Sequence, residues 1–259
     1  MHTYRQGPET LEIASVAFSE SGVVLELMQT IERYHRPLRL HGKRTALYGV
    51  ALADKIAFHD VERVDLYRAG LLHDIGRLTL PGELLNKDGP LTADEYALVQ
   101  SHPRAGAELL KPFSFLRIPA ILIAHHHERW DGYGYPYGLR GNFIPLGSRI
   151  LAVADTFDAL TSEQPYRPSH DVESALRLLQ VVAGSQLDPF LVAQFVQLAP
   201  ALFDSVASGP GAESIDCVGA GRAPCPGRGA SVPPGPPPSS SQQDGLDGLS
   251  KKRSVTWGE

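Results

Sequence analysis

The sequence predicts an all-α fold, a bundle of packed helices, and three observations support this prediction. Apolar residues recur at helical spacing, helix-capping signals recur along the chain, and few segments alternate between polar and apolar residues as strands do. With 259 residues and 42% hydrophobic content, the chain can bury one main core. We therefore expect a single helical domain.

Two helices are predicted in the first third of the chain by apolar residues that repeat every three or four positions. Such a repeat places the apolar side chains on one helix face, which packs against a neighbour. The two faces consist of Ala46, Val50, Ala53 and Ala57, and of Val64, Tyr67 and Leu71. An earlier apolar stripe around residues 23–31 fits either the core of the bundle or a homodimer contact.

A third helix is predicted by the capping box of Thr92 and Glu95. In such a box each side chain bonds to the backbone N–H of the other residue, so a helix should begin at Ala93. We expect it to end near His102 and Pro103.

Later helices follow from the same kinds of signal. The stretches around Ile121 and Val153 lie within helical patterns, although they are rich in branched residues. Asp188 precedes Pro189, which predicts a helix cap followed by a proline in the first helical position. A final helix is therefore expected from Pro189 to Leu198.

The composition changes abruptly from about residue 207 onward, where Pro, Gly and Ser dominate and large apolar residues are rare. Such a segment cannot bury enough apolar surface to fold. We expect a short N-terminal lead at residues 1–14, one domain at 15–203 and a disordered tail at 207–259.

Charge and cysteine content exclude several functions. A net charge of −5 and a pI near 6.1 argue against large nucleic acids as partners, although a local site for a phosphorylated ligand remains compatible. Cys217 and Cys225 both fall in the tail without the spacing of a zinc site. No secretion signal precedes the domain and no apolar run of about 20 residues predicts a membrane span, so we expect a cytoplasmic protein.

The stretch HHERWDGYGYP, residues 126–136, is the densest group of functional residue types in the chain. It places two adjacent histidines beside two carboxylates and a glycine-rich turn, and neutral imidazole is the commonest transition-metal ligand. A helical bundle builds metal sites from side chains that project inward from several helices. The candidate ligands outside the tail are His41, His73, Asp74, His102, His126, His127 and Asp155.

Two metal ions explain these candidates better than one. Adjacent residues on a helix point about 100° apart, so we expect His126 and His127 to serve different ions. Asp74 could bridge the two ions, an arrangement that activates water for phosphoryl chemistry. Nitrogen and oxygen ligands without thiolate suit iron or manganese at least as well as zinc. Taken singly, His41 and His102 would more often be surface or capping residues.

The turn that ends the stretch has features of a ligand-binding lip. Gly132 and Gly134 permit a positive φ and a close backbone approach, and Pro136 stiffens the exit. Tyr133 and Tyr135 offer rings for stacking. An ordinary tight loop with buried aromatic residues is the alternative.

These motifs together resemble the HD-GYP domains, a branch of the HD metal-dependent phosphohydrolase superfamily. His73-Asp74 lies within HDIG, and HHERWDGYGYP matches the pattern HHExxDGxGYP at every defined position. His41-x-x-Arg44, Ser101-His-Pro103 and the downstream PYR occur in the same order. The resemblance extends from about residue 15 to residue 200.

The resemblance implies an HD-domain helical bundle with a GYP loop and a binuclear iron or manganese centre. It implies hydrolysis of cyclic di-GMP to linear pGpG by a hydroxide that two metals activate, with further cleavage to GMP left open. The implied ligands are the seven candidates above, with Asp74 as the bridge. Members with a third metal carry a glutamate where this chain has Pro37, so two metals are expected.

Two departures from the family pattern concern the substrate. Arg77 replaces the usual lysine of HDIGK, and uncharged Gln164 stands where an arginine often occurs, while Arg167 remains. Losing one charge-assisted contact to phosphate costs roughly 1.5 to 3 kcal/mol. The implied catalytic residues are Asp74 and Arg77, and the implied substrate-binding residues are Arg77, Gly134, Tyr135, Pro136, Gln164 and Arg167.

Two other readings stay open. Gln164 is compatible with a catalytically weak or inactive module that binds a cyclic dinucleotide or a signalling partner protein. A second alternative keeps the hydrolase but changes its substrate to another cyclic dinucleotide or nucleotide.

Overall fold

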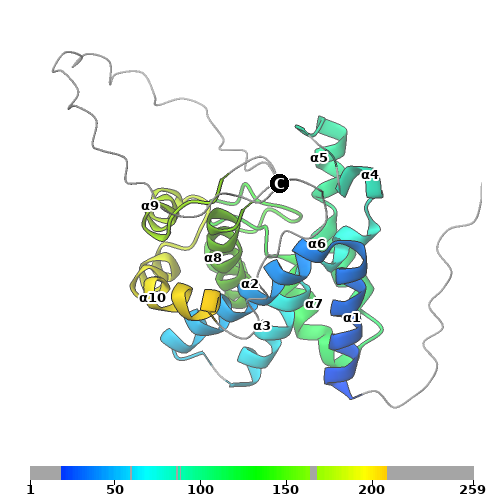
Figure 1. Cartoon of the computed structure of the whole chain (residues 1–259), viewed down its shortest axis with the longest axis horizontal. Helices are drawn as coiled ribbons and strands as arrows, with labels where there is room; N and C mark the ends of the chain where they lie inside the picture. The colour runs from blue at the N-terminus through cyan, green and yellow to red at the C-terminus, as the bar shows by residue number, and fades with distance from the viewer. Residues whose placement is uncertain (1–18, 59, 86, 88, 164–167, 209–259) are drawn as a thin grey trace, which may run out of the picture. The chain divides into compact units, whose positions relative to one another are not determined.

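The computed structural model describes residues 19–58, 60–85, 87, 89–163 and 168–208 (Figure 1). Over these residues the regular secondary structure is helical, apart from one isolated bridge between Ala183 and Leu187. The predicted all-α fold class is therefore confirmed. The predicted lead and nearly all of the predicted tail lie outside the described residues. The α-helices are α1 (Glu20–Tyr34), α2 (Arg36–Lys55), α3 (Asp60–Leu72), α4 (Gly82–Leu85), α5 (Ala93–Val99), α6 (His102–Leu110), α7 (Arg117–Ala124), α8 (Leu146–Thr161), α9 (Val172–Val182) and α10 (Pro189–Ser208), and the 3-10 helices are η1 (Ile75–Thr79), η2 (Ser114–Leu116) and η3 (Gly141–Phe143).

Helix α2 is the centre of the bundle (Figure 1). It packs against α1, α3, α8 and α10, while α6 packs against α7 and η1. Tyr48 of α2, Phe157 of α8 and Phe195 of α10 are fully buried and meet edge to face, with ring centroids 5.0 to 6.3 Å apart. This aromatic cluster fixes α2 and α8, two of the helices that carry candidate ligands.

The predicted apolar face of α2 is wrong at one position. Ala46 and Ala53 are buried, but α2 ends at Lys55 and Ala57 lies exposed beyond it with a φ of 57°. A left-handed φ is incompatible with continuing the helix, so the repeat of apolar residues extends past the helix itself.

The predicted face of α3 is also partly wrong. Val64 is 50% exposed and Tyr67 is 42% exposed, whereas Leu71 is buried as predicted. The core side of α3 consists instead of Leu66, Ala69 and Leu72. The small Ala69 on this side allows α3 to approach its neighbour closely. The larger apolar side chains of Val64 and Tyr67 lie on the opposite side of α3, which faces solvent.

The capping predictions are confirmed. Thr92 and Glu95 form both hydrogen bonds of a capping box at the start of α5. The predicted end of that helix is wrong, because α5 stops at Val99 and His102 opens the next helix with a proline in its first turn. Asp188 Oδ1 accepts hydrogen bonds from the backbone N–H groups of Phe190 and Leu191, which caps α10.

Among the described helices, one stretch in α10, Pro189–Val206, is long and apolar enough to span a membrane. Length and composition alone are weak grounds for a span, because the core helix of a soluble protein passes the same test. Leu191, Phe195 and Ala199 of this helix are buried in the bundle.

Candidate metal centre

Three buried histidines present the same ring nitrogen to one region of the bundle. The Nδ1–H groups of His73, His102 and His126 donate to backbone carbonyls three residues earlier, at distances of 2.6 to 2.9 Å. Each Nε2 is then left with a lone pair for another partner. These local backbone contacts therefore prepare all three rings as metal ligands.

The first group of potential ligands joins α2, the end of α3 and α8. His41 Nε2 lies 3.1 Å from His73 Nε2 and 3.0 Å from Asp155 Oδ1, and all three ligand atoms lie within 4.8 Å of one another. Two nitrogens and a carboxylate oxygen at this spacing suit one divalent ion.

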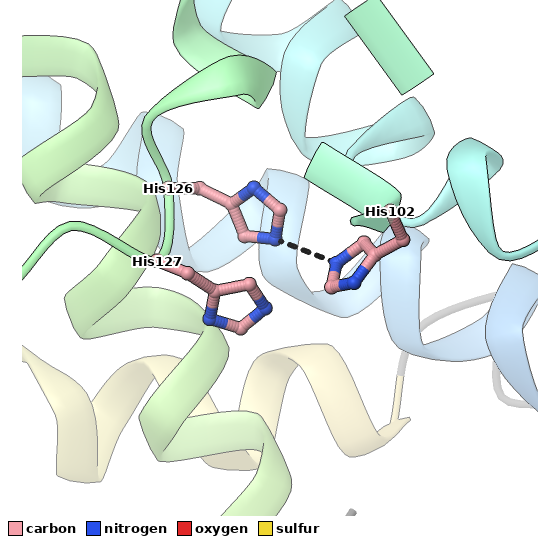
Figure 2. A group of neighbouring side chains, drawn as sticks. All are labelled: His102, His126 and His127. Carbon is pink, nitrogen blue, oxygen red and sulfur yellow. Dashed lines mark hydrogen bonds between the residues drawn. The ribbon is translucent and has the colours of Figure 1, made fainter. Parts of the chain in front are cut away.

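The second group contains His102, His126 and His127, whose imidazoles face one another in Figure 2. His102 Nε2 and His126 Nε2 lie 3.4 Å apart, although both rings already donate from Nδ1. Two neutral imidazoles in these tautomers would place lone pair against lone pair, which a cation between them would relieve. This group can hold a second ion.

The expectation that His126 and His127 point apart is wrong. Helix α7 ends at Ala124, so both residues lie in the turn that follows and not on the helix. Their ring centroids are 4.1 Å apart, and their ligand atoms converge on the same group. The argument from a 100° helical rotation therefore does not apply to them.

Asp74 lies between the two groups. Its Oδ2 is 3.6 Å from His73 Nε2 and 3.9 Å from His41 Nε2, and its Oδ1 is 3.3 Å from His102 Nε2. Asp74 also forms a third potential ligand set with His73 and His126. One oxygen therefore faces each group, which is the geometry of a bridging carboxylate.

Arg77 anchors this carboxylate from the side of η1. Its Nε donates to Asp74 Oδ1 at 2.8 Å. Burial raises the pKa of Asp74, but Arg77, His73 and His102 outweigh it and hold the pKa well below the ordinary value. Asp74 is therefore a carboxylate at neutral pH and is available to a cation.

The histidines differ in their affinity for protons. Burial lowers the pKa of His126 well below its usual range and, with the nearby His102, lowers that of His127 to about 3. Burial also lowers the pKa of His41, but hydrogen bonds to Asp155 and Asp158 raise it to about 10. In the metal-free protein at pH 7, His41 therefore carries a proton that an arriving ion must displace.

Metal binding should consequently release a proton. His41 is protonated below a pKa of about 10, so between pH 6 and 8 the apparent affinity for Mn²⁺ should rise by up to roughly tenfold per pH unit. Calorimetric titration of metal-free protein in buffers with different ionisation enthalpies measures the released protons directly. An enthalpy that is identical in all buffers contradicts protonation of His41.

A close backbone contact brings the two groups together. A Cβ on Gly76 would lie 2.0 Å from the carbonyl oxygen of His102 and 2.5 Å from the backbone nitrogen of Gly106. Residue 76 therefore has to be glycine for η1 to pack against α6. This contact places Asp74, just before η1, beside His102 at the start of α6.

The GYP loop folds back onto the second histidine group. The Tyr135 ring stacks on His127 with centroids 4.9 Å apart, and the Tyr135 N–H donates to the His127 carbonyl. Gly132 has a φ of +86° as predicted, whereas Gly134 serves a close approach, because a Cβ there would lie 2.2 Å from the backbone nitrogen of Arg129. Pro136 follows Tyr135 and is partly buried. The loop thus forms one rim of the centre.

Glu128 holds this loop and is a residue that sequence reasoning missed. It is 4% exposed, and its two carboxylate oxygens accept hydrogen bonds from the backbone N–H groups of Tyr137 at 2.7 Å and Leu139 at 2.9 Å. The available sequence signal was its place directly after His126 and His127. A carboxylate that is buried beside a site needs hydrogen-bond partners, so this position indicated a supporting role.

Replacing Glu128 with alanine should loosen the GYP loop, because two backbone donors lose a charged acceptor at a cost of about 1.5 to 3 kcal/mol each. We expect faster proteolytic cleavage within residues 132–143 and weaker substrate binding. The exposed Glu83 provides a control, and Glu83→Ala should leave the cleavage rate unchanged. Equal cleavage of both variants would show that Glu128 does not order the loop.

Two of the predicted substrate-binding residues are not described by the structure. Gln164 and Arg167 lie outside the described residues, so their predicted contacts stay predictions. His125 takes no part in the two groups, since its Nδ1 donates to the Ile121 carbonyl and its ring packs against Tyr137. Asp158, which contacts His41, was not predicted.

Comparison with known proteins places these residues in a family context. A family model described as HD domain matches residues 27–191. The chain is 41% identical over 140 residues to the cyclic di-GMP phosphodiesterase response regulator RpfG of Xanthomonas campestris, covering 53% of this chain and 37% of the relative. It is 33% identical over 184 residues to a cyclic di-GMP phosphodiesterase of Thermotoga maritima, covering 70% of this chain and 50% of the relative.

Solved structures share the fold. A cyclic GMP-AMP specific phosphodiesterase of Vibrio cholerae aligns with a TM-score of 0.56 at 23% identity, over 70% of this chain and 51% of that one. The HD domain of the Listeria monocytogenes phosphodiesterase PgpH aligns with a TM-score of 0.51 at 18% identity, over 70% of this chain and 98% of that one. This chain spans half the length or less of the curated relatives named above.

Proposed function

Because the chain belongs to the HD domain family, we propose that it hydrolyses a phosphodiester bond of a cyclic dinucleotide at a centre of two divalent metal ions. The observation that carries this proposal is the position of Asp74, whose two oxygens face separate groups of histidines. A bridged pair of ions is the arrangement suited to displacement at phosphorus.

The donor set of this chain fits such ions. The proposed ligands are the imidazole nitrogens and carboxylate oxygens of His41, His73, Asp74, His102, His126, His127 and Asp155. Nitrogen and oxygen donors without thiolate fit iron or manganese. The ions, when bound, would activate water and offset the charge that develops on the phosphate.

The protein's own residues would prepare this chemistry before the substrate arrives. The Nδ1 bonds of His73, His102 and His126 fix the ligand nitrogens, so little reorganisation is needed at the centre. Arg77 keeps Asp74 ionised, and its guanidinium carries further N–H donors of the kind that bind phosphate. Asp74 and Arg77 are the proposed catalytic residues.

The substrate is proposed from the relatives and from the rim of the site. The relatives above are named for cyclic di-GMP, and another at 38% identity, from Vibrio cholerae, is named 3'3'-cGAMP-specific phosphodiesterase 3. The stacked Tyr135 with Gly134 and Pro136 offers a surface for a base or ribose beside the metal centre. Arg77 and Arg167 are the proposed phosphate contacts, and Gln164 is a proposed substrate-binding residue without a charge.

A substrate panel tests this function. Metal-free protein is loaded with Mn²⁺ or Fe²⁺, its metal content is measured, and cyclic di-GMP, 3'3'-cGAMP and cyclic di-AMP are each supplied. We expect linear dinucleotide from at least one of them, and none after treatment with a chelator. Stoichiometric binding of a cyclic dinucleotide without turnover by metal-loaded protein would favour a binding module instead.

A further inference from the structure

Asp158 is a buried carboxylate on α8 that directly contacts a proposed ligand. It is 1% exposed, and its Oδ2 accepts a hydrogen bond from His41 Nδ1 at 2.7 Å. Its Oδ1 and Oδ2 also accept bonds from Arg44 Nε at 2.5 Å and Arg44 Nη2 at 2.9 Å. Ser162 Oγ lies 3.2 Å from Oδ2 and completes the set.

This contact distinguishes His41 from the other histidines of the centre. His73, His102 and His126 donate from Nδ1 to neutral backbone carbonyls, whereas His41 donates to a carboxylate. A hydrogen bond to an ionised acceptor is about twice as strong as a neutral one, and it raises the basicity of the opposite ring nitrogen. His41 is also the least buried of these four, with a side chain that is 18% exposed.

Helix α8 holds the His41 ring from both ends. Asp155 and Asp158 are three residues apart and so lie on one helix face. Asp155 Oδ1 faces Nε2 of the imidazole, and Asp158 Oδ2 faces Nδ1. The ring orientation is therefore set by the same helix that supplies the neighbouring proposed ligand.

Arg44 offsets the charge of Asp158 in this position. Its Nε and Nη2 donate to the two oxygens of the buried carboxylate. Arg44 lies one turn after His41 on α2 and also donates to Ser162 at 2.8 Å, where α8 ends. The two-point contact with Arg44 thus ties α2 to α8 at the level of the metal centre.

We propose that Asp158 is a positioning residue, which fixes the His41 tautomer with the proton on Nδ1 and directs Nε2 at the ion, while Arg44 supplies the counter-charge. This inference rests on the proposed function, because it assigns His41 to a metal ion. Partners of this kind typically change metal affinity by 10- to 100-fold when they are removed.

The test is calorimetric titration of metal-free protein with Mn²⁺. Asp158→Asn should weaken the binding of one of the two equivalents of Mn²⁺ by roughly 10- to 100-fold. The matched control is Asp188→Asn, which breaks another buried carboxylate–arginine pair, with Arg149 at 2.7 Å, in which neither residue is a proposed ligand. This control should lower the melting temperature and leave metal affinity unchanged.

A double variant keeps the proposal falsifiable if Asp158→Asn folds poorly. Asp158→Asn combined with Arg44→Gln removes both charges, so no buried charge is left unpaired. We expect the double variant to regain stability but not metal affinity. Full recovery of metal affinity along with stability would overturn the positioning role, and so would wild-type affinity in Asp158→Asn.

The outcome separates the two proposals. Loss of Mn²⁺ affinity in Asp158→Asn, together with no hydrolysis of any cyclic dinucleotide by the wild type, would overturn the function and support the positioning role. Hydrolysis by the wild type, together with unchanged metal affinity in Asp158→Asn, would support the function and overturn the positioning role.

Discussion

Replacing Asp74 with alanine is expected to abolish hydrolysis of the cyclic dinucleotide, with a loss of at least about a thousandfold in kcat/KM. The reason is that one side chain serves both groups of ligands, since its two oxygens face His73 and His102. The variant should also retain less than the two equivalents of metal per chain expected of the wild type. Steady-state kinetics and elemental analysis of the same preparations measure both effects.

Asp94→Ala is a suitable control for this variant, because Asp94 is an exposed residue in the first turn of α5. It should keep wild-type kinetics and metal content. Equal turnover by wild type and Asp74→Ala would remove Asp74 from the proposed mechanism.

Replacing Gly76 with alanine is expected to lower the free energy of unfolding by about 3 kcal/mol or more. This loss is at or above the largest destabilisation that an overpacked side chain usually causes. The added Cβ would lie 2.0 Å from the His102 carbonyl oxygen, and a backbone atom cannot move aside as a flexible side chain can. Because η1 would have to move away from α6, Asp74 and His102 would separate. Metal affinity should therefore fall together with stability, as measured by denaturant unfolding and Mn²⁺ titration.

Gly82 provides the matched control for this substitution. A Cβ on Gly82 would meet nothing within 4 Å, so Gly82→Ala should stay within about 0.5 kcal/mol of the wild type. A stable Gly76→Ala protein with wild-type metal affinity would show that the contact between η1 and α6 does not place the ligands.

The candidate ligands could be predicted from the sequence because their chemistry lies in the residue types themselves. His73-Asp74 and His126-His127 are polar pairs beside apolar segments, and such burial requires partners. The structure brings these candidates together with His41, His102 and Asp155. Their roles as ligands remain proposals, which the metal titrations test.

Other features depend on where helices end and which face they bury, which local patterns do not determine. The orientation of His126 and His127 was mispredicted, because the apolar run that precedes them does not show that α7 stops at Ala124. Likewise, Val64 and Tyr67 repeat at helical spacing but lie on the solvent side of α3.

The supporting carboxylates were missed for a different reason. Asp158 carries no spacing signal that distinguishes it from a surface carboxylate, and Glu128 was marked only by its place directly after His126 and His127. The partners of Asp158 are distant in sequence, and those of Glu128 are backbone groups. Asp158 meets His41 across 117 positions of sequence, and Glu128 binds backbone N–H groups of the loop that follows it. Only the packed structure identifies such partners.

The most direct test of the proposed two-metal phosphodiesterase is a chromatographic time course of cyclic di-GMP with the wild-type chain carrying Mn²⁺. Linear pGpG should accumulate in the metal-loaded sample, and none should form in the sample treated with chelator. Intact cyclic di-GMP after prolonged incubation with protein that holds two Mn²⁺ ions per chain would contradict it.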